Sequence, residues 1–230
     1  FSIALNDNIS KYEQKYDEIK DFNELPKFPL DINKIHNVVS FACEGLSGVS
    51  MSQVEMNANI QFYDGMSTNE IQDILIRSAN DLISLEAPNY QYAAARLLLY
   101  TLQKKVYGRY EHHSLTEIID ANIDRSDYDS AIREKYTDTE LKKLNTYIKH
   151  DRNEEFTYAG LRQVVDKYLC QDRSNGDIFE TPQHMYMMIA ATLFANYPKE
   201  TRMQVARVIS DRELENIKQG EYDAPKGTVS

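Results

Sequence analysis

The stretch that decides the fold runs from Thr68 to Val106 and contains two apolar patterns separated by Pro88. The first pattern is TNEIQDILIRSANDLISL, from Thr68 to Leu85, in which apolar residues recur three and four positions apart, as in an amphipathic helix. The second is YQYAAARLLLYTLQKKV, from Tyr90 to Val106, which is strongly apolar along its length. Because proline breaks a helix, this stretch predicts two successive helices.

Residues that favour helix ends flank both patterns. Thr68 is predicted as the N-cap of the first helix, with Glu70 in its first turn. Lys104 and Lys105 place positive charge beside the last carbonyl groups of the second helix, and Gly108 is predicted to end it. The two predicted helices therefore begin at Thr68 and at Tyr90, and the second ends before Gly108.

The same signals extend outward from this stretch in both directions. A helix from Asp31 to Gly45 and one from Ser50 or Ser52 to Phe62 are predicted before it, and one from Phe156 to Tyr168 after it. Capping boxes at Ser114/Glu117 and Thr137/Glu140 predict two further helix starts, and Ser174-Asn175-Gly176 predicts the turn of a hairpin. Thr181-Pro182 predicts the start of a helix that Pro198 ends, and a charged helix is predicted from Lys199 to about Gln219.

The composition agrees with a mainly α protein and excludes several function classes. The 230 residues include only 8 Gly and 6 Pro, and the mean hydropathy is -0.58. A net charge of -10 and the lack of a basic stripe argue against a sequence-independent grip on nucleic acid. No apolar run approaches a membrane span, so a cytoplasmic protein is expected, in the host cytoplasm if a phage encodes it.

Several residue groups that could carry chemistry have simpler interpretations. Cys43 and Cys170 lack metal-ligand spacing and are expected to be reduced thiols. The side chains of His112 and His113 should point apart, and no third ligand follows at a suitable spacing, so no metal site is predicted. Pairs of acidic residues are expected on solvated helix faces: Glu154 with Glu155, Asp120 with Asp124, and Asp64 with Glu70.

An anion site is the one binding site that the residues themselves suggest. Lys34, Lys104 and Lys105 are the basic residues best placed to meet a phosphate, because Thr68 adds a hydroxyl and free N–H groups at a helix start. There is no Gly-rich phosphate loop. Reasoning from the residues alone therefore ends at a helical domain with an anion site.

From about Asp31 to Arg202 the chain resembles the N-terminal region of class Ia ribonucleoside-diphosphate reductase large subunits of bacteria and T4-like phages. The segments that carry the resemblance include LDINKIHNVVSFACEGL, EAPNYQYAAARLLLYTLQKKVYGRYE and GDIFETPQHMYMMIAATLFANYPKETR. It implies an ATP-cone-like helical lobe at 31–108 and the reductase helical domain, with one short β-hairpin, at 109–205. Residues 1–30 are then a divergent appendage and 206–230 an unrelated tail, and the catalytic barrel is absent.

The resemblance also implies a site. The nucleotide-contacting residues of the family's cone correspond to Lys34 for phosphate, Thr68 at a helix start and Lys104 at a helix end, with ATP or dATP as the allosteric effector. The family's cone opens with a hairpin that carries a Lys-x-Asp-Gly turn, whereas Lys20 to Phe28 reads KDFNELPKF without Gly. This departure predicts a weaker phosphate clamp, because the turn supplies backbone donors.

No catalytic residue is carried over, because the family's chemistry resides in the barrel. The resemblance implies a regulatory and structural part of a split or truncated large subunit, inactive alone. Its partners would be a barrel-bearing chain and, through it, the small radical-generating subunit. That interpretation predicts an exposed apolar surface on residues 110–205. Two alternatives are a non-catalytic interaction module derived from a reductase and a fragment of a longer chain.

Overall fold

The computed structural model describes residues 31–63, 65–108 and 111–218, with side chains up to residue 208. The expected mainly α fold is confirmed: within these residues the regular structure is helical apart from one antiparallel pair of two-residue strands. The expectations for residues 1–30, Asp64 and the end of the chain beyond 218 lie outside the described residues. None of the helices in the described ranges combines the length and the apolar content needed to cross a membrane.

The first half of the described chain forms four helices whose ends follow the predicted signals. Ser50 is the N-cap of the second helix. Gly45 lies just after the first helix with a φ of 70°, and Gly108 is the C-cap of the fourth with a φ of 64°. Glycine adopts positive φ at little steric cost. The helices are α2 (Ile32–Cys43), α3 (Met51–Asn59), α4 (Thr68–Asn80) and α5 (Tyr90–Tyr107).

The second half contains more elements, and several of them are short. The capping boxes predicted at Ser114/Glu117 and Thr137/Glu140 are both confirmed, as is the hairpin around Gly176. The elements are α6 (Leu115–Asp124), α7 (Ala131–Lys135), α8 (Asp138–Asn145), the 3-10 helix η2 (His150–Glu155), α9 (Tyr158–Lys167), β1 (Gln171–Asp172), β2 (Asp177–Ile178), α10 (Pro182–Leu193) and α11 (Lys199–Lys218).

Several predicted helix ends need correction. Helix α3 ends at Asn59 rather than at Phe62, and α9 begins at Tyr158 rather than at Phe156. The N-cap of α4 is Ser67 and not Thr68, because the Ser67 hydroxyl accepts a hydrogen bond from the Glu70 N–H at 3.3 Å and the Glu70 carboxylate accepts one from the Ser67 N–H. Helix α4 ends at Asn80 rather than at Leu85. Helix α10 ends at Leu193, with Phe194 as its C-cap, before Pro198 is reached.

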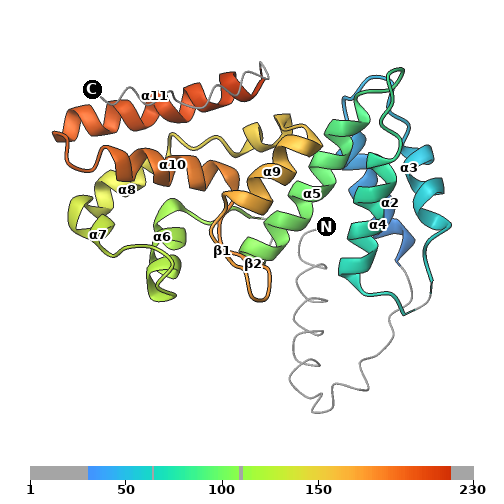
Figure 1. Cartoon of the computed structure of the whole chain (residues 1–230), viewed down its shortest axis with the longest axis horizontal. Helices are drawn as coiled ribbons and strands as arrows, with labels where there is room; N and C mark the ends of the chain where they lie inside the picture. Colours follow the sequence, from blue (N-terminus) through green and yellow to red (C-terminus); the bar gives the residue numbers. More distant parts are fainter. Residues whose placement is uncertain (1–30, 64, 109–110, 219–230) are drawn as a thin grey trace, which may run out of the picture.

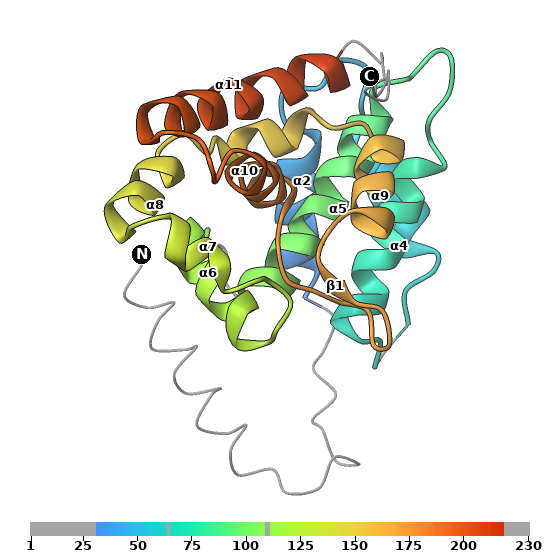
Figure 2. The same ribbon diagram turned by 60° about the vertical axis from the view of Figure 1, so that its left-hand side comes forward.

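The helices enclose two hydrophobic cores. The first core joins α2 to α5 with α9, so a helix from the second half of the chain packs with the first four. The second core joins α6, α7, α8, α10 and α11. Figures 1 and 2 both place α9 beside α5 and α11 along α10. The spatial grouping therefore differs from the order of the helices along the chain.

Candidate functional site

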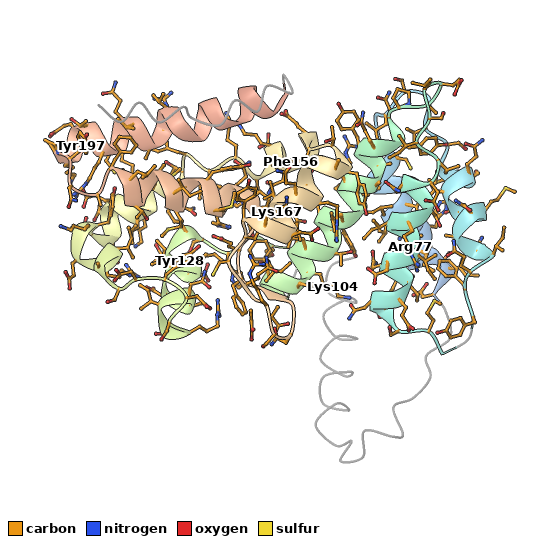
Figure 3. The ribbon with its side chains drawn as sticks, in the orientation of Figure 1. Arg77, Lys104, Tyr128, Phe156, Lys167 and Tyr197 are labelled. Carbon is orange, nitrogen blue, oxygen red and sulfur yellow. The ribbon has the colours of Figure 1, made fainter. Side chains whose placement is uncertain are left out.

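One end of the first core brings the starts and ends of its helices together. Helices α4 and α5 are joined by a short connection, and the Thr101 hydroxyl of α5 donates to the Gln72 side chain of α4 at 3.4 Å. Thr68 precedes Gln72 by one turn and Lys104 follows Thr101 by one turn, so both lie at the same end of the helix pair. Figure 3 shows Lys104 at that end of α5.

Helix α2 contributes Lys34 to this end. The Arg96 guanidinium donates to the Glu44 carbonyl at 2.7 Å, and the Asn89 amide donates to the Ser47 carbonyl at 2.9 Å. These bonds fix the end of α2 beside the start of α5, so the start of α2 lies toward the end of α5. The structure thus places Lys34, Thr68 and Lys104 at one end of the lobe, which we call the cationic end.

All three of these side chains are exposed at the cationic end. Lys34 has 84% of its side chain exposed and forms an ion pair with Asp31 at 3.6 Å. The start of α4 already holds a carboxylate, because Glu70 accepts from the Ser67 N–H at 2.8 Å and from Tyr63 at 3.2 Å. The hydrogen bonds from Ser67 lower the pKa of Glu70. An added anion here would need the two lysines to offset this negative charge.

Lys105 lines a separate cavity. It lines a polar cavity of about 610 Å³ between α4, α5, α9 and the hairpin, together with Arg77 and Arg162. Asp73 and Asp166 also line this cavity, and Arg162 forms an ion pair with Asp166 at 3.2 Å. Lys104 is not among its lining residues. The two adjacent lysines, which the sequence analysis treated together, therefore serve different surfaces.

The second core carries an exposed apolar groove of about 590 Å³. Ile189 and Leu193 of α10 form one wall and are 46% and 65% exposed. An apolar surface was expected between residues 110 and 205, and this groove provides one. We call it the apolar groove; its other lining residues are Asp127, Tyr128, Asp129, Ala131, Ile132, Lys135, Tyr168, Glu180, Met185, Met188, Thr192, Ala195 and Asn196.

A buried acid that the sequence analysis did not single out lies at this groove. The Glu180 carboxylate is only 4% exposed and accepts hydrogen bonds from the Tyr128 hydroxyl and, at 2.7 Å, from the Cys170 N–H. Burial raises the pKa of Glu180. Figure 3 labels Tyr128, on the connection between α6 and α7. Because Tyr128 and Glu180 are 52 positions apart, no local sequence pattern could have indicated this pair.

The histidines were also incompletely described by sequence. His112 stacks on His150, with ring centroids 3.8 Å apart, and the His113 carbonyl lies 3.1 Å from Nε2 of His184. The sequence analysis considered His112 and His113 alone, and the contacts with His150 and His184 come only from the tertiary structure. Among the described residues, no group of three His, Cys, Asp or Glu side chains is arranged to hold a metal ion.

The remaining candidate groups have structural roles. Cys43 and Cys170 are free thiols, and burial raises the pKa of each to about 11, so neither is a ready nucleophile near neutral pH. Asp120 is held by an ion pair with Arg133. Glu154 is half-buried and Glu155 exposed on η2, and neither contributes to the cationic end.

Comparisons with known proteins divide the chain into two matched segments. Residues 27–105 match the ATP cone domain family, and residues 154–214 match the family described as ribonucleotide reductase, all-alpha domain. The second match runs past residue 205, and α11 continues to Lys218. The boundaries expected at 30, 108 and 205 stay predictions.

Relatives of known name are similar over most of this chain. The ribonucleoside-diphosphate reductase 1 subunit alpha of Escherichia coli is 45% identical over 182 residues, which is 79% of this chain and 24% of the relative. The corresponding subunit of Enterobacteria phage T4 is 40% identical over 80% of this chain and 25% of its own length. That of Helicobacter pylori is 38% identical over 79% and 23%. The chain thus spans about a quarter of the length of the curated relatives it matches.

Proposed function

This chain belongs to the family of class Ia ribonucleoside-diphosphate reductase alpha subunits, as the counterpart of their N-terminal region, and we propose that it is the regulatory and structural part of such a reductase. In this proposal it supports the reduction of ribonucleotides to deoxyribonucleotides only together with a barrel-bearing chain. The observation that carries the proposal is the 45% identity over 182 residues, because it extends across both matched domains.

The proposed regulatory site is the cationic end of the first core. The ATP cone match covers Lys34, Thr68 and Lys104, and the three side chains are exposed at one end of the lobe. Two ammonium groups and the start of a helix suit a polyphosphate, since both attract negative charge. We therefore assign ATP or dATP to this end as an allosteric effector.

The proposal assigns no catalytic residue to this chain. Its two cysteines have pKa values of about 11, and each lies partly buried within the helical lobes. Cys43 and Cys170 fall within the two matched helical segments, whereas the family's catalytic cysteines lie in the barrel. We therefore expect the chain to be inactive in nucleotide reduction when assayed alone.

The apolar groove is the proposed contact with the barrel-bearing chain. Ile189 and Leu193 expose apolar surface beside Met188, and an exposed apolar groove of this kind favours a protein partner over water. The buried Glu180 adds a polar group at the groove. Through the barrel-bearing chain, this part would work with the small radical-generating subunit.

Calorimetric titration of the chain with ATP and with dATP tests the effector site. Lys104→Ala should weaken binding at least tenfold, because a charge-assisted hydrogen bond to phosphate contributes roughly 1.5 to 3 kcal/mol. Lys105→Ala is the matched control, since Lys105 lines the separate polar cavity. Binding that survives Lys104→Ala but is lost in Lys105→Ala would move the site to that cavity.

Affinity capture of the tagged chain from its native cell tests the catalytic context. A captured barrel-bearing chain with ribonucleotide reduction in the eluate would support the proposal. Leu193→Asp should reduce that capture, because a charge within the groove is costly to desolvate. Capture of an unrelated protein without activity would instead favour a non-catalytic module derived from a reductase.

A further inference from the structure

Four of the five histidines of this chain meet at the end of α5. His112 and His150 stack with centroids 3.8 Å apart and ring planes 6° apart, and His184 lies 5.0 Å from His150. Tyr107, the last residue of α5, has its ring 5.1 Å from that of His113 and 5.5 Å from that of His112. We call these five side chains the histidine cluster. It joins α5 of the first core to η2 and to α10 of the second core.

The hydrogen bonds define the protonation state of the deepest ring. His184 is fully buried, and its Nε2 lies 3.1 Å from the His113 carbonyl oxygen, which can only accept. Nε2 therefore carries the proton. Nδ1 lies 3.2 Å from the Tyr107 hydroxyl and 3.1 Å from the Thr181 hydroxyl, so it accepts from one of them. His184 is a neutral imidazole whose two nitrogens are both engaged.

The ring of His150 lies between the surface and His184. His112 is exposed, His150 is half-buried, and His184 is buried, so the three rings form a path inward from solvent. Nδ1 of His150 is buried and has no hydrogen-bond partner among the described residues. A proton added at that nitrogen would find no acceptor, and a second charge on the stacked His112 would repel the first.

Few acidic groups are close enough to stabilise positive charge in the cluster. Burial and the neighbouring imidazoles lower the pKa of His150 to about 4 and that of His184 to about 3, and burial also lowers the pKa of His112. Only Asp151 raises the pKa of His150. The charged groups nearby are Lys104 and Lys105 at the end of α5, Glu111 before α6, Lys149 beside η2, Asp151, Arg152, Glu154 and Glu155 on η2, and Glu180 before α10, while α10 itself carries no Asp, Glu, Lys or Arg.

We propose that the histidine cluster is a proton-sensitive joint, at which proton uptake by His150, together with its neighbour His112 or His184, separates the end of α5 from η2 and α10 while both cores stay folded. An exposed imidazole has a pKa near 6.5, so the open joint binds protons that the closed joint excludes. The closed joint is therefore fully favoured above about pH 6.5 and becomes weaker as the pH falls toward 4. This inference does not depend on nucleotide binding.

Hydrogen exchange of the full chain at pH 7.5 and 5.5 tests the joint, with protection factors corrected for intrinsic exchange. Protection at the end of α5, in η2 and at the start of α10 should fall about tenfold at pH 5.5 for each histidine that takes up a proton on opening. Protection in α4 should stay unchanged. Equal protection at both pH values in the three joint segments would overturn the proposal.

Substitutions assign the effect to the cluster. His150→Phe retains a flat ring for stacking on His112 and removes one titrating group, so the pH-dependent loss of protection should shrink about tenfold. His112→Phe, at an exposed position, is a second variant should His150→Phe fail to fold. His36→Phe is the matched control, because His36 lies outside the cluster and pairs with Glu55. If both cluster variants lose as much protection between pH 7.5 and pH 5.5 as the unmodified chain does, the joint is refuted.

Discussion

The two cores differ in how their helices are held together. The first core is almost entirely aliphatic, with buried alanines and leucines packed between α2, α4, α5 and α9. In the second core a buried ion pair between Glu140 of α8 and Arg202 of α11 spans 62 positions, and Tyr136 donates to the Ala191 carbonyl at 2.8 Å. A cavity in an aliphatic core costs the apolar contacts that are lost, whereas removing one partner of a buried ion pair also leaves a charge unpaired.

Removing one ion-pair partner should have the largest effect. Arg202→Met leaves the Glu140 carboxylate, which is 4% exposed, without its 2.5 Å partner, and it removes the guanidinium that lies over the Tyr136 ring. We expect a loss of about 3 to 5 kcal/mol in the free energy of unfolding, measured in urea. Arg207→Met, at an exposed position on the same helix, is the control and should change stability by less than about 1 kcal/mol.

A cavity in the first core should cost somewhat less. Leu97 is 1% exposed in α5, and Leu97→Ala removes apolar contacts without leaving a charge unpaired. The expected loss is about 3 kcal/mol in urea unfolding. Leu97→Met, which nearly conserves volume, should lose less than about 1.5 kcal/mol. A larger loss for Leu97→Ala than for Arg202→Met would reverse the contrast between the two cores.

Acid should weaken the second core through the same ion pair. Burial would raise the pKa of Glu140, but hydrogen bonds from Arg202 and Thr137 outweigh it and lower that pKa from 4.5 to about 2. The stabilisation is therefore complete above about pH 4.5 and is lost as the pH falls through 2, by up to about 3 kcal/mol. Urea titrations at several pH values measure it, and in Arg202→Met this acid dependence should be much smaller.

Helix capping should give the smallest effect and tests the corrected start of α4. Ser67→Ala removes the hydroxyl that accepts from the Glu70 N–H and should cost about 1 kcal/mol in thermal or urea unfolding. Thr68→Ala at the next position should change stability by less than about 0.5 kcal/mol, since Thr68 is exposed and is not the cap. The opposite ranking would restore Thr68 as the N-cap.

The corrected N-cap of α4 shows that a local pattern is sufficient to predict the start of this helix. The spacing Ser67-x-x-Glu70 is a capping box, and the same pattern correctly predicted the starts of α6 and α8. The information was therefore present in the sequence. The end of α4 at Asn80 was less accessible, because Leu82 continues the helical period without being helical.

The sequence by itself determined most of the helices, most of their ends and the hairpin at Gly176, because each depends on neighbours within a few positions. Lys34, Thr68 and Lys104 stay predictions as effector residues. Only the tertiary structure decided that α9 joins the first core, that Lys105 faces a different cavity from Lys104, and that Glu140 meets Arg202. It also decided that His112 stacks on His150 and that His184 lies next to His150. These contacts join residues tens of positions apart, and their energies depend on burial, which a local pattern does not contain.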